Sequence, residues 1–268
     1  MGMIDAAGIT WRAGRATLLD DVCVEAGEGE LVAIVGPNGA GKSSLLAVLA
    51  GDVRPDRGSV TIAGAALRGL RPAALARLRA VLPQKVTLAF PFTVAQVVEM
   101  GQYGRPYDER TQREVMDATE VAHLAHRAFP TLSGGEQARV SLARVLAQGA
   151  PVLLLDEPTA PLDLRHQEQV MGLVRQRARL GDTVVVVLHD LNLAAAYADR
   201  IVVMREGRVA ADGAPGDVLD AGLLSEVYAC PIEVRDNLVL PVRHCDFFPE
   251  VRLPLGGPSR TSSSAPAG

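Results

Sequence analysis

The sequence has no hydrophobic run long enough to cross a membrane. A spanning helix needs about 20 consecutive apolar residues, whereas the longest apolar runs in these 268 residues, such as 184–188, have the length of a β-strand. Hydrophobic residues still make up 48% of the chain, which is enough to build a buried core. We therefore expect a globular protein that reaches any membrane through a protein partner.

Cysteine is scarce as well. Cys23, Cys230 and Cys245 are widely spaced, and no two of them form a CxxC pair. This pattern favours neither a disulfide framework nor a zinc site, and it fits a reducing cytosol. The first residues lack the basic and apolar regions of a secretory signal. Ala6 stands where an N-myristoylation motif needs Ser or Thr, so no lipid anchor is expected.

The chain has no excess of positive charge. It carries 27 Lys and Arg against 31 Asp and Glu, a formal net charge of −4. This balance argues against a nucleic-acid binder that works through bulk electrostatics. Lysine occurs only as Lys42 and Lys85, so arginine supplies nearly all the positive charge.

Apolar segments and turn residues predict alternating strands and helices with a helical stretch in the middle. We predict a core over 1–84 and 151–253, a helical insert over 85–150, and a disordered Pro/Ser/Gly-rich tail over 254–268. Within these parts the predicted strands are one that runs into Trp11 and 17–25, 31–35, 58–63, 80–82, 152–155, 183–188, 201–204, 208–211 and 238–242. The predicted helices are 42–50, 67–78, 93–100, 109–124, 134–148 and 163–179, with a helical pair before the final strand.

Residues 36–43, GPNGAGKS, fit the P-loop pattern GxxxxGK[ST] between an apolar strand and a helix. The glycines let backbone N–H groups turn inward around a phosphate, and the helix N-terminus adds the positive end of its dipole. Lys42 would neutralise the β- and γ-oxygens, and the Ser43 hydroxyl would bind Mg²⁺. The pattern is not GxGxxG, so we expect a nucleoside triphosphate and no dinucleotide. The residues predicted to bind it are Gly36, Pro37, Asn38, Gly39, Ala40, Gly41, Lys42, Ser43 and Ser44.

The apolar strand 152–155 leads directly into Asp156 and Glu157. In open α/β sheets ligands bind at the carboxyl ends of the strands, where Asp156 would hold Mg²⁺ directly or through water. Glu157 would accept a proton from an attacking water. Taken alone this pair would fit a solvated turn better, and the P-loop upstream is what favours the catalytic interpretation.

The stretch LSGGEQ at 132–137 has two interpretations. Ser133 can cap a helix, with Glu136 as its capping-box partner. A serine hydroxyl and free amides at a helix N-terminus can equally form an anion site, which would be the second phosphate site in the chain. The residues alone do not decide between them.

The same stretch resembles the signature motif of ATP-binding cassette (ABC) ATPases, usually LSGGQ, with Glu136 in place of the last Gln. The resemblance covers about residues 1–245. It implies an α/β fold, a P-loop NTPase nucleotide-binding domain of ABC type with a RecA-like core, an antiparallel β subdomain and a helical insert. It also implies an ATPase that uses ATP and Mg²⁺.

Further motifs match in order. Gln84 resembles the Q-loop glutamine, which senses Mg²⁺ and the γ-phosphate, and His189 resembles the switch histidine. Trp11 falls at the position of the aromatic residue that stacks on adenine; a half-buried core aromatic is the alternative. The resemblance thus implies Glu157, His189, Gln84 and Lys42 as catalytic residues and Ser43, Gln84 and Asp156 as the metal site.

The resemblance also implies a homodimer. In ABC ATPases two subunits pack head to tail, and each signature motif covers the γ-phosphate held by the other subunit's P-loop. Asp163 resembles the D-loop aspartate at the dimer seam, although APLD replaces the usual SALD. The residues implied at this seam are Leu132, Ser133, Gly134, Gly135, Glu136 and Asp163.

The segments 79–84, 88–94 and 131–148 together resemble haem (hemin) import ATPases, in the group that also serves ferric siderophores and cobalamin. This implies a peripheral subunit on the cytoplasmic face of the bacterial inner membrane. Its partners would be two copies of a transmembrane permease and, through them, an external substrate-binding protein, with no nucleic acid. Phe90 and Phe92 flank Pro91 and suggest a patch for the permease. The alternative is a buried plug with Thr93 as a helix cap.

Several other classes of protein fit the sequence less well. A ferric siderophore or cobalamin importer is the nearest alternative. A soluble ABC ATPase acting on DNA or ribosomes usually has a coiled-coil arm or two fused cassettes, and an exporter cassette is usually fused to spanning helices; neither feature occurs here. A binding module without catalysis is disfavoured because Lys42, Glu157 and His189 are all present. His123, His126 and Cys230 are assigned no site.

Overall fold

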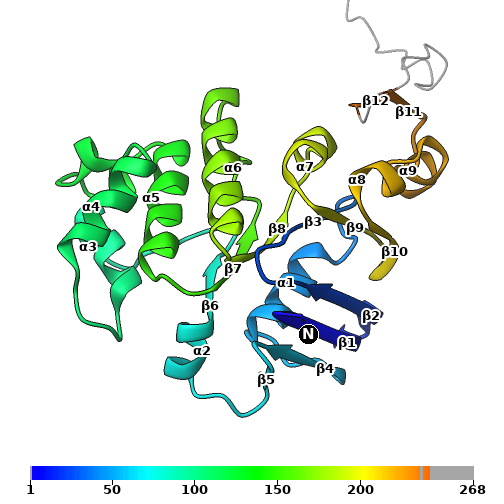
Figure 1. The fold of residues 1–268 in the computed structure, drawn as a ribbon, viewed down its shortest axis with the longest axis horizontal. Helices are drawn as coiled ribbons and strands as arrows, with labels where there is room; N and C mark the ends of the chain where they lie inside the picture. The colour runs from blue at the N-terminus through cyan, green and yellow to red at the C-terminus, as the bar shows by residue number, and fades with distance from the viewer. Residues whose placement is uncertain (1, 236–237, 242–268) are drawn as a thin grey trace, which may run out of the picture.

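The computed structural model describes residues 2–235 and 238–241 (Figure 1). Cys245, Val242 and the predicted tail 254–268 lie outside this range. At the centre is a six-stranded sheet in the order β10-β9-β3-β8-β7-β6, parallel except for β10. Its strands are β3 (Leu31–Val35), β6 (Arg79–Leu82), β7 (Val152–Asp156), β8 (Thr183–Val187), β9 (Arg200–Arg205) and β10 (Arg208–Gly213).

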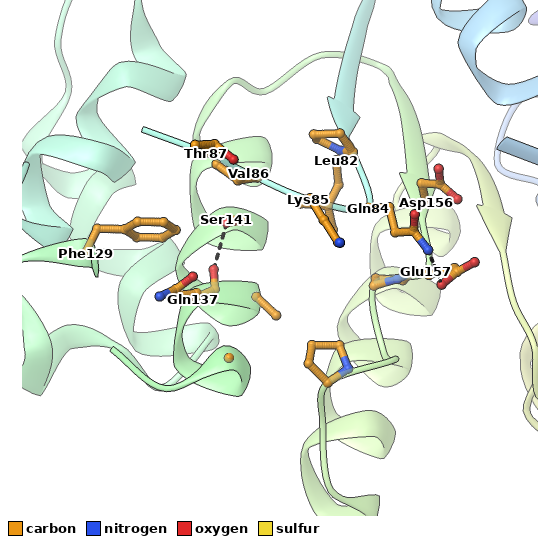
Figure 2. A pocket seen from close by; sticks show the side chains of 15 residues that line it. Leu82, Gln84, Lys85, Val86, Thr87, Phe129, Gln137, Ser141, Asp156 and Glu157 are labelled. Carbon is orange, nitrogen blue, oxygen red and sulfur yellow. Dashed lines mark hydrogen bonds between the residues drawn. The ribbon is translucent and has the colours of Figure 1, made fainter. Parts of the chain in front are cut away.

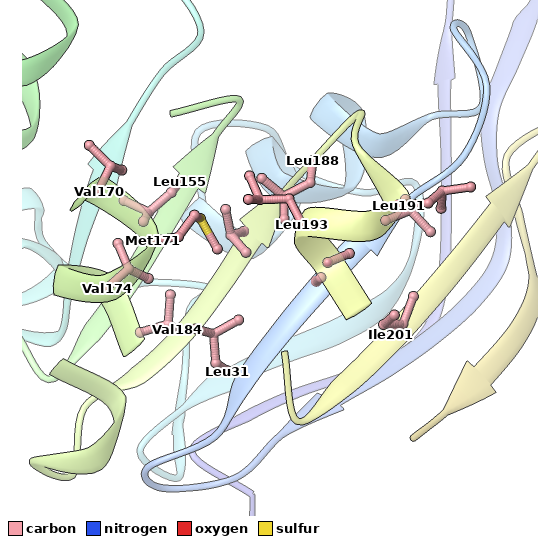
Figure 3. Packing of buried hydrophobic residues seen from close by; sticks show 14 of the residues in the cluster. Leu31, Leu155, Val170, Met171, Val174, Val184, Leu188, Leu191, Leu193 and Ile201 are labelled. Carbon is pink, nitrogen blue, oxygen red and sulfur yellow. The ribbon is translucent and has the colours of Figure 1, made fainter. Parts of the chain in front are cut away.

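Both faces of this sheet are covered, which explains why β3, β7 and β8 are buried at every residue. Alternate residues point to opposite faces. Ile34 packs with α1 (Lys42–Ala50) and the antiparallel strands β1 (Ile4–Ala13), β2 (Ala16–Ala26) and β4 (Arg57–Ile62). Leu31 and Val184 pack on the other face, against α6 (Leu164–Arg179) and α7 (Leu191–Tyr197) (Figure 3).

The helical stretch contains α3 (Val94–Glu99), α4 (Glu109–Ala118) and α5 (Gly134–Ala147), which share a separate apolar cluster. In Figure 1 these helices lie at one end of the molecule, away from β1, β2 and β4. Helix α5 has two buried faces: Val140 packs inside the helical cluster, and Leu142 packs on the central sheet. Helix α5 therefore connects the helical cluster to the central sheet.

Several predicted element boundaries are wrong, and three elements, β5 (Ala65–Ala66), α7 and β11 (Ile232–Arg235), were missed. The helix predicted over 67–78 is α2 (Pro72–Leu78), which begins at its proline, while Ala65–Ala66 form the short strand β5. The helix predicted over 109–124 ends at Ala118, because Glu120 takes a left-handed conformation with φ 53°. Helix α7 and strand β11 (Ile232–Arg235) were not predicted.

The C-terminal part of the described chain contains the predicted helical pair, α8 (Pro215–Val218) and α9 (Ala221–Tyr228), and strand β12 (Leu238–Pro241). β12 pairs with β11 in a two-stranded antiparallel sheet. Within residues 2–235 and 238–241, none of the helices combines the length and the apolar character that a bilayer span requires.

Candidate functional site

The P-loop connects β3 to α1, and its glycines are required by close backbone approaches. A Cβ at Gly36 would lie 2.2 Å from the carbonyl oxygen of Met204, and one at Gly41 would lie 2.7 Å from that of Leu18. Both glycines have positive φ, 147° and 99°. Gly207, in the turn between β9 and β10, donates its N–H to Ala40 O at 3.0 Å. The turn between β9 and β10 therefore supports the P-loop through this hydrogen bond, a contact that the sequence did not predict.

Lys42 is 5% exposed and points back into the loop. Its Nζ donates to the carbonyl oxygens of Gly36 at 2.8 Å and Pro37 at 3.0 Å. Burial lowers the pKa of the Lys42 ammonium, and the carboxylates of Glu157 and Asp156 oppose that shift. The ammonium group thus bonds to two carbonyl oxygens of its own loop, which phosphate oxygens could replace.

Ser43 and Asp156 form the oxygen pair expected for Mg²⁺. Ser43 Oγ donates to Asp156 Oδ1 at 3.1 Å. Burial raises the pKa of Asp156, and the neighbouring Glu157 raises it further. A hydroxyl and a carboxylate at the end of β7 are the donor types that Mg²⁺ prefers beside phosphates, and a divalent cation would offset the cost of burying the charge. The residues therefore fit the metal.

Glu157 is where three strand ends meet. Gln84, after β6, donates from Nε2 to Glu157 Oε2 at 2.8 Å, and His189 Nε2, after β8, lies 2.5 Å from Oε1. Figure 2 shows the amide of Gln84 directed at the Glu157 carboxylate. Gln84 was also predicted at the metal, where its amide oxygen would bind; its amide nitrogen donates to Glu157, and the metal role stays a prediction. These contacts fix the carboxylate in one orientation, as a proton acceptor for a bound water requires.

The backbone of Glu157 is in the left-handed region, with φ 52°. Its N–H donates to Val187 O at 3.2 Å, so the strained residue is tied to the neighbouring strand β8. A non-glycine residue in this region costs about 1–2 kcal/mol. Such strain concentrates at functional sites, because the surrounding structure maintains it for the sake of side-chain placement.

A cleft of about 320 Å³ opens beside this carboxylate, between the strand ends and α5 (Figure 2). Gln84 and Glu157 line one side, and Gln137 and Ser141 of α5 line the other. Ser141 Oγ donates to Gln137 O at 2.7 Å, within the α5 wall. The cleft therefore joins the candidate catalytic residues to the helix that begins with the signature motif.

The signature motif caps α5, as the first of its two interpretations predicts. Ser133 Oγ accepts from Glu136 N at 3.3 Å, and Glu136 Oε2 accepts from Ser133 N at 2.7 Å. The bond from the Ser133 backbone is the main cause that lowers the pKa of Glu136. Within the described part of the chain, no hydrogen bond of residues 132–136 reaches the P-loop. Contact of this motif with a second phosphate stays a prediction.

The structure therefore forms two separate groups from the predicted site residues. Lys42, Ser43, Gln84, Asp156, Glu157 and His189 converge at the strand ends. Gly135 lies instead against the loop after β7, where a Cβ would approach Pro161 O at 3.3 Å, and Leu132 packs in the apolar cluster of the helical stretch. That loop ends at Asp163, whose side chain caps α6 by accepting from His166 N at 2.9 Å.

The remaining P-loop and aromatic positions have distinct environments. Asn38 and Gly39 are exposed at the tip of the P-loop, while Ser44 is partly buried. Trp11 is partly buried on β1, opposite Leu19, and packs against the apolar cluster around α1. This environment agrees with the half-buried core alternative for Trp11, and stacking on adenine stays a prediction.

Phe90 and Phe92 have different environments. Phe90 agrees with an exposed patch, and Phe92 agrees in part with a buried plug. Phe90 is 66% exposed, whereas Phe92 packs partly against the apolar cluster of the helical stretch. Their rings touch edge to face, with centroids 6.0 Å apart. Thr93 caps α3 and forms a capping box with Gln96, as predicted. Phe92 is thus a partial plug that supports an exposed Phe90.

Comparisons with known proteins agree with the geometry. Residues 19–160 match the family described as ABC transporter. The hemin import ATP-binding protein HmuV of Thermobifida fusca is 53% identical over 244 residues, which cover 86% of this chain and 85% of that protein. The protein of the same name from Nocardia farcinica is 56% identical over 239 residues, covering 85% and 83%. A dimeric post-hydrolysis ATP-binding cassette bound to ADP and Pi is 30% identical, with a TM-score of 0.72 over 79% of this chain and 98% of that one.

Proposed function

Because the chain belongs to the ABC transporter family, we propose that it is the ATP-hydrolysing subunit of a hemin importer, working as a homodimer beneath a separate membrane permease. The family and the fold class predicted from the motifs are confirmed. The observation that carries the ATPase proposal is the meeting of Gln84, Glu157 and His189 beside the P-loop. The hemin proposal is supported by relatives named as hemin import ATP-binding proteins, which are more than 50% identical over most of both chains.

The residues at the strand ends divide the work of hydrolysis among them. Lys42 exchanges its two carbonyl partners for phosphate oxygens and neutralises the charge that grows on them. Glu157, held by Gln84 and His189, orients the attacking water and accepts its proton. Ser43 and Asp156 would hold Mg²⁺, which when bound supplies positive charge next to the phosphates. We propose that Ser133 and the amides of α5 complete the site from the partner copy, because they lie away from their own P-loop.

An exposed groove with aromatic side chains on the helical stretch is the surface that we propose for the permease. It has a volume of about 520 Å³, and Phe92, Met100, Tyr103 and Tyr107 are among the residues that line it. Tyr103 and Tyr107 are 94% and 54% exposed, and Phe90 lies close to Phe92. Exposed aromatic side chains of this density are typical of protein interfaces. We propose that one permease copy docks here on each of the two ATPase subunits, with the ATPase on the cytoplasmic face of the bacterial inner membrane and an external binding protein opposite.

Reassembly tests the transported substrate. The subunit is combined with its permease in liposomes, and ATP turnover is measured while an external binding protein delivers hemin, a ferric siderophore or cobalamin. We expect hemin to raise the turnover several-fold and the other two to leave it at the basal rate. If only the siderophore or only cobalamin raises the turnover, the proposed substrate is wrong and the ATPase proposal stands. No ATP turnover in any assembly would contradict the function itself.

Replacing Phe90 and Phe92 together with alanine is expected to weaken permease binding roughly tenfold or more, because buried aromatic anchors contribute about 2 kcal/mol or more at interfaces. Transport and permease co-purification should fall together. Basal ATP turnover of the isolated subunit should stay unchanged, since neither ring contacts the strand-end residues. The matched control is Leu180→Ala, which removes another large exposed side chain, 70% exposed, at the far end of α6. Intact permease binding in the double variant would make the pair a plug of the helical stretch only.

A further inference from the structure

His166 lies between two carboxylates that come from different parts of the chain. Its ring Nδ1 is 2.7 Å from Asp163 Oδ1, the same oxygen that accepts the His166 backbone N–H. Its other ring nitrogen, Nε2, lies 3.9 Å from Glu120 Oε2. The neighbouring Arg165 donates to the other oxygen, Glu120 Oε1, at 2.7 Å. The first turn of α6 is thus joined to its N-cap residue, Asp163, and to Glu120.

Glu120 in turn is fastened to the signature helix. Arg139 of α5 is 8% exposed, and its Nη1 donates to the carbonyl oxygens of Thr119 at 3.2 Å and Glu120 at 3.0 Å. Glu120 holds a left-handed backbone with φ 53°, which directs its carbonyl and its side chain to two different helices. A continuous series of contacts therefore runs from α5, which begins with the signature motif, to Asp163.

A second, independent contact joins the same two elements. Gly135 packs so closely on the loop after β7 that a Cβ there would lie 3.3 Å from Pro161 O and 3.4 Å from the Leu162 side chain. Further along α6, Gln169 Nε2 donates to Ala118 O at 3.1 Å. The loop that carries Asp163 therefore contacts the helix that carries Ser133 directly at Gly135, and α6 is joined to the end of α4 next to Glu120.

We propose that His166 is a positioning residue, which fixes Asp163 relative to the signature motif by way of Glu120. The two elements then meet the partner subunit as one rigid unit and close over its nucleotide together. The inference rests on the proposed head-to-tail dimer. None of these contacts involves the P-loop, so loss of His166 should impair closure and turnover and leave the binding of ATP to the single subunit unchanged.

Three substitutions of His166 in the full chain separate its contacts. His166→Ala removes both contacts and is expected to lower kcat about tenfold while KM for ATP stays within about twofold. His166→Asn keeps an N–H donor near the place of Nδ1, and His166→Gln keeps one near Nε2. Because the proposed coupling needs both ring contacts, each of these two variants should restore only part of kcat. In the Glu157→Gln background, His166→Ala should also reduce the ATP-dependent dimer measured by light scattering.

The controls distinguish positioning from stability. His123→Ala removes an exposed histidine on the helical stretch and should leave kcat within about twofold. His166→Ala and Glu120→Ala should be non-additive in kcat if they act through one series of contacts. Normal kcat in His166→Ala, full additivity, or unmodified kcat in either His166→Asn or His166→Gln would overturn the inference. Absence of ATP turnover in the unmodified protein would instead overturn the proposed function.

Discussion

Replacing Glu157 with glutamine is expected to lower steady-state ATP turnover by a factor of roughly 10²–10⁴, the range of a lost general base. The substitution leaves the size and shape of the side chain unchanged. One end of the new amide can still meet His189 Nε2, now 2.5 Å from Oε1, and the other can meet Gln84, whose own amide can turn over to present its oxygen. What disappears is the carboxylate that takes up the proton of the attacking water.

ATP should remain bound to the Glu157→Gln protein, because the P-loop and Lys42 are untouched. The closed dimer should therefore accumulate with ATP and become visible as a doubling of mass in light scattering. The matched control is Glu114→Gln, the same change in an exposed glutamate of α4 that pairs only with Arg110 among the described contacts. Turnover within a factor of two of the unmodified protein would show that Glu157 is not the general base. Its contacts with Gln84 and His189 would then have a structural role only.

The local chemistry of the site could be predicted from the sequence because each motif follows directly from a strand. A P-loop and an Asp-Glu pair can be identified from the residues that precede and follow them in the sequence. Which strand ends meet depends on the strand order, and the order β3-β8-β7-β6 brings together residues as far apart as Gln84, Glu157 and His189. The family resemblance supplied that long-range information, and local patterns could not.

Features that depend on close packing could not be predicted. Gly207 holds the P-loop from behind through the Ala40 carbonyl, yet in the sequence it is only the second residue of a turn. The left-handed backbone of Glu157 has no sequence signal, since glutamate rarely adopts it. The contacts of His166 had one weak signal, the spacing of Asp163 and His166 by three residues at the start of a helix. Its second partner, Glu120, lies 46 positions earlier than His166 and becomes a neighbour only through the packing of α4, α5 and α6.

The wrong helix ends have the same origin. Periodicity extended the helix predicted over 109–124 through a region where Thr119 uses its hydroxyl to bond the Val115 carbonyl at 2.8 Å. That bond closes the last turn of α4, and Glu120 then turns the chain back toward α6. The early end of α4 is therefore part of the arrangement that places Glu120 beside His166.

Replacing Lys42 with alanine is expected to weaken ATP binding roughly 10- to 150-fold, which corresponds to the loss of about 1.5–3 kcal/mol for a hydrogen-bonded charged group. The loss should be this large because the ammonium is already desolvated. It is 5% exposed, and burial lowers its pKa, so phosphate oxygens would meet it with little remaining water to displace. Titration calorimetry with ATP and Mg²⁺ measures the change directly.

The control for Lys42→Ala is Lys85→Ala, the same deletion at the chain's other lysine, which is exposed and bonds to neither Gly36 nor Pro37. Because Lys42 also ties the P-loop to itself through those two carbonyls, the variant could lose affinity by loosening the loop. The two causes differ in their effect on the ligand-free protein: a loosened loop lowers its melting temperature, whereas a lost phosphate contact leaves it unchanged or raises it by relieving the buried charge. An unchanged melting temperature with weaker ATP binding would therefore assign the effect to the phosphate contact, and unchanged affinity would contradict the role of Lys42 in the P-loop.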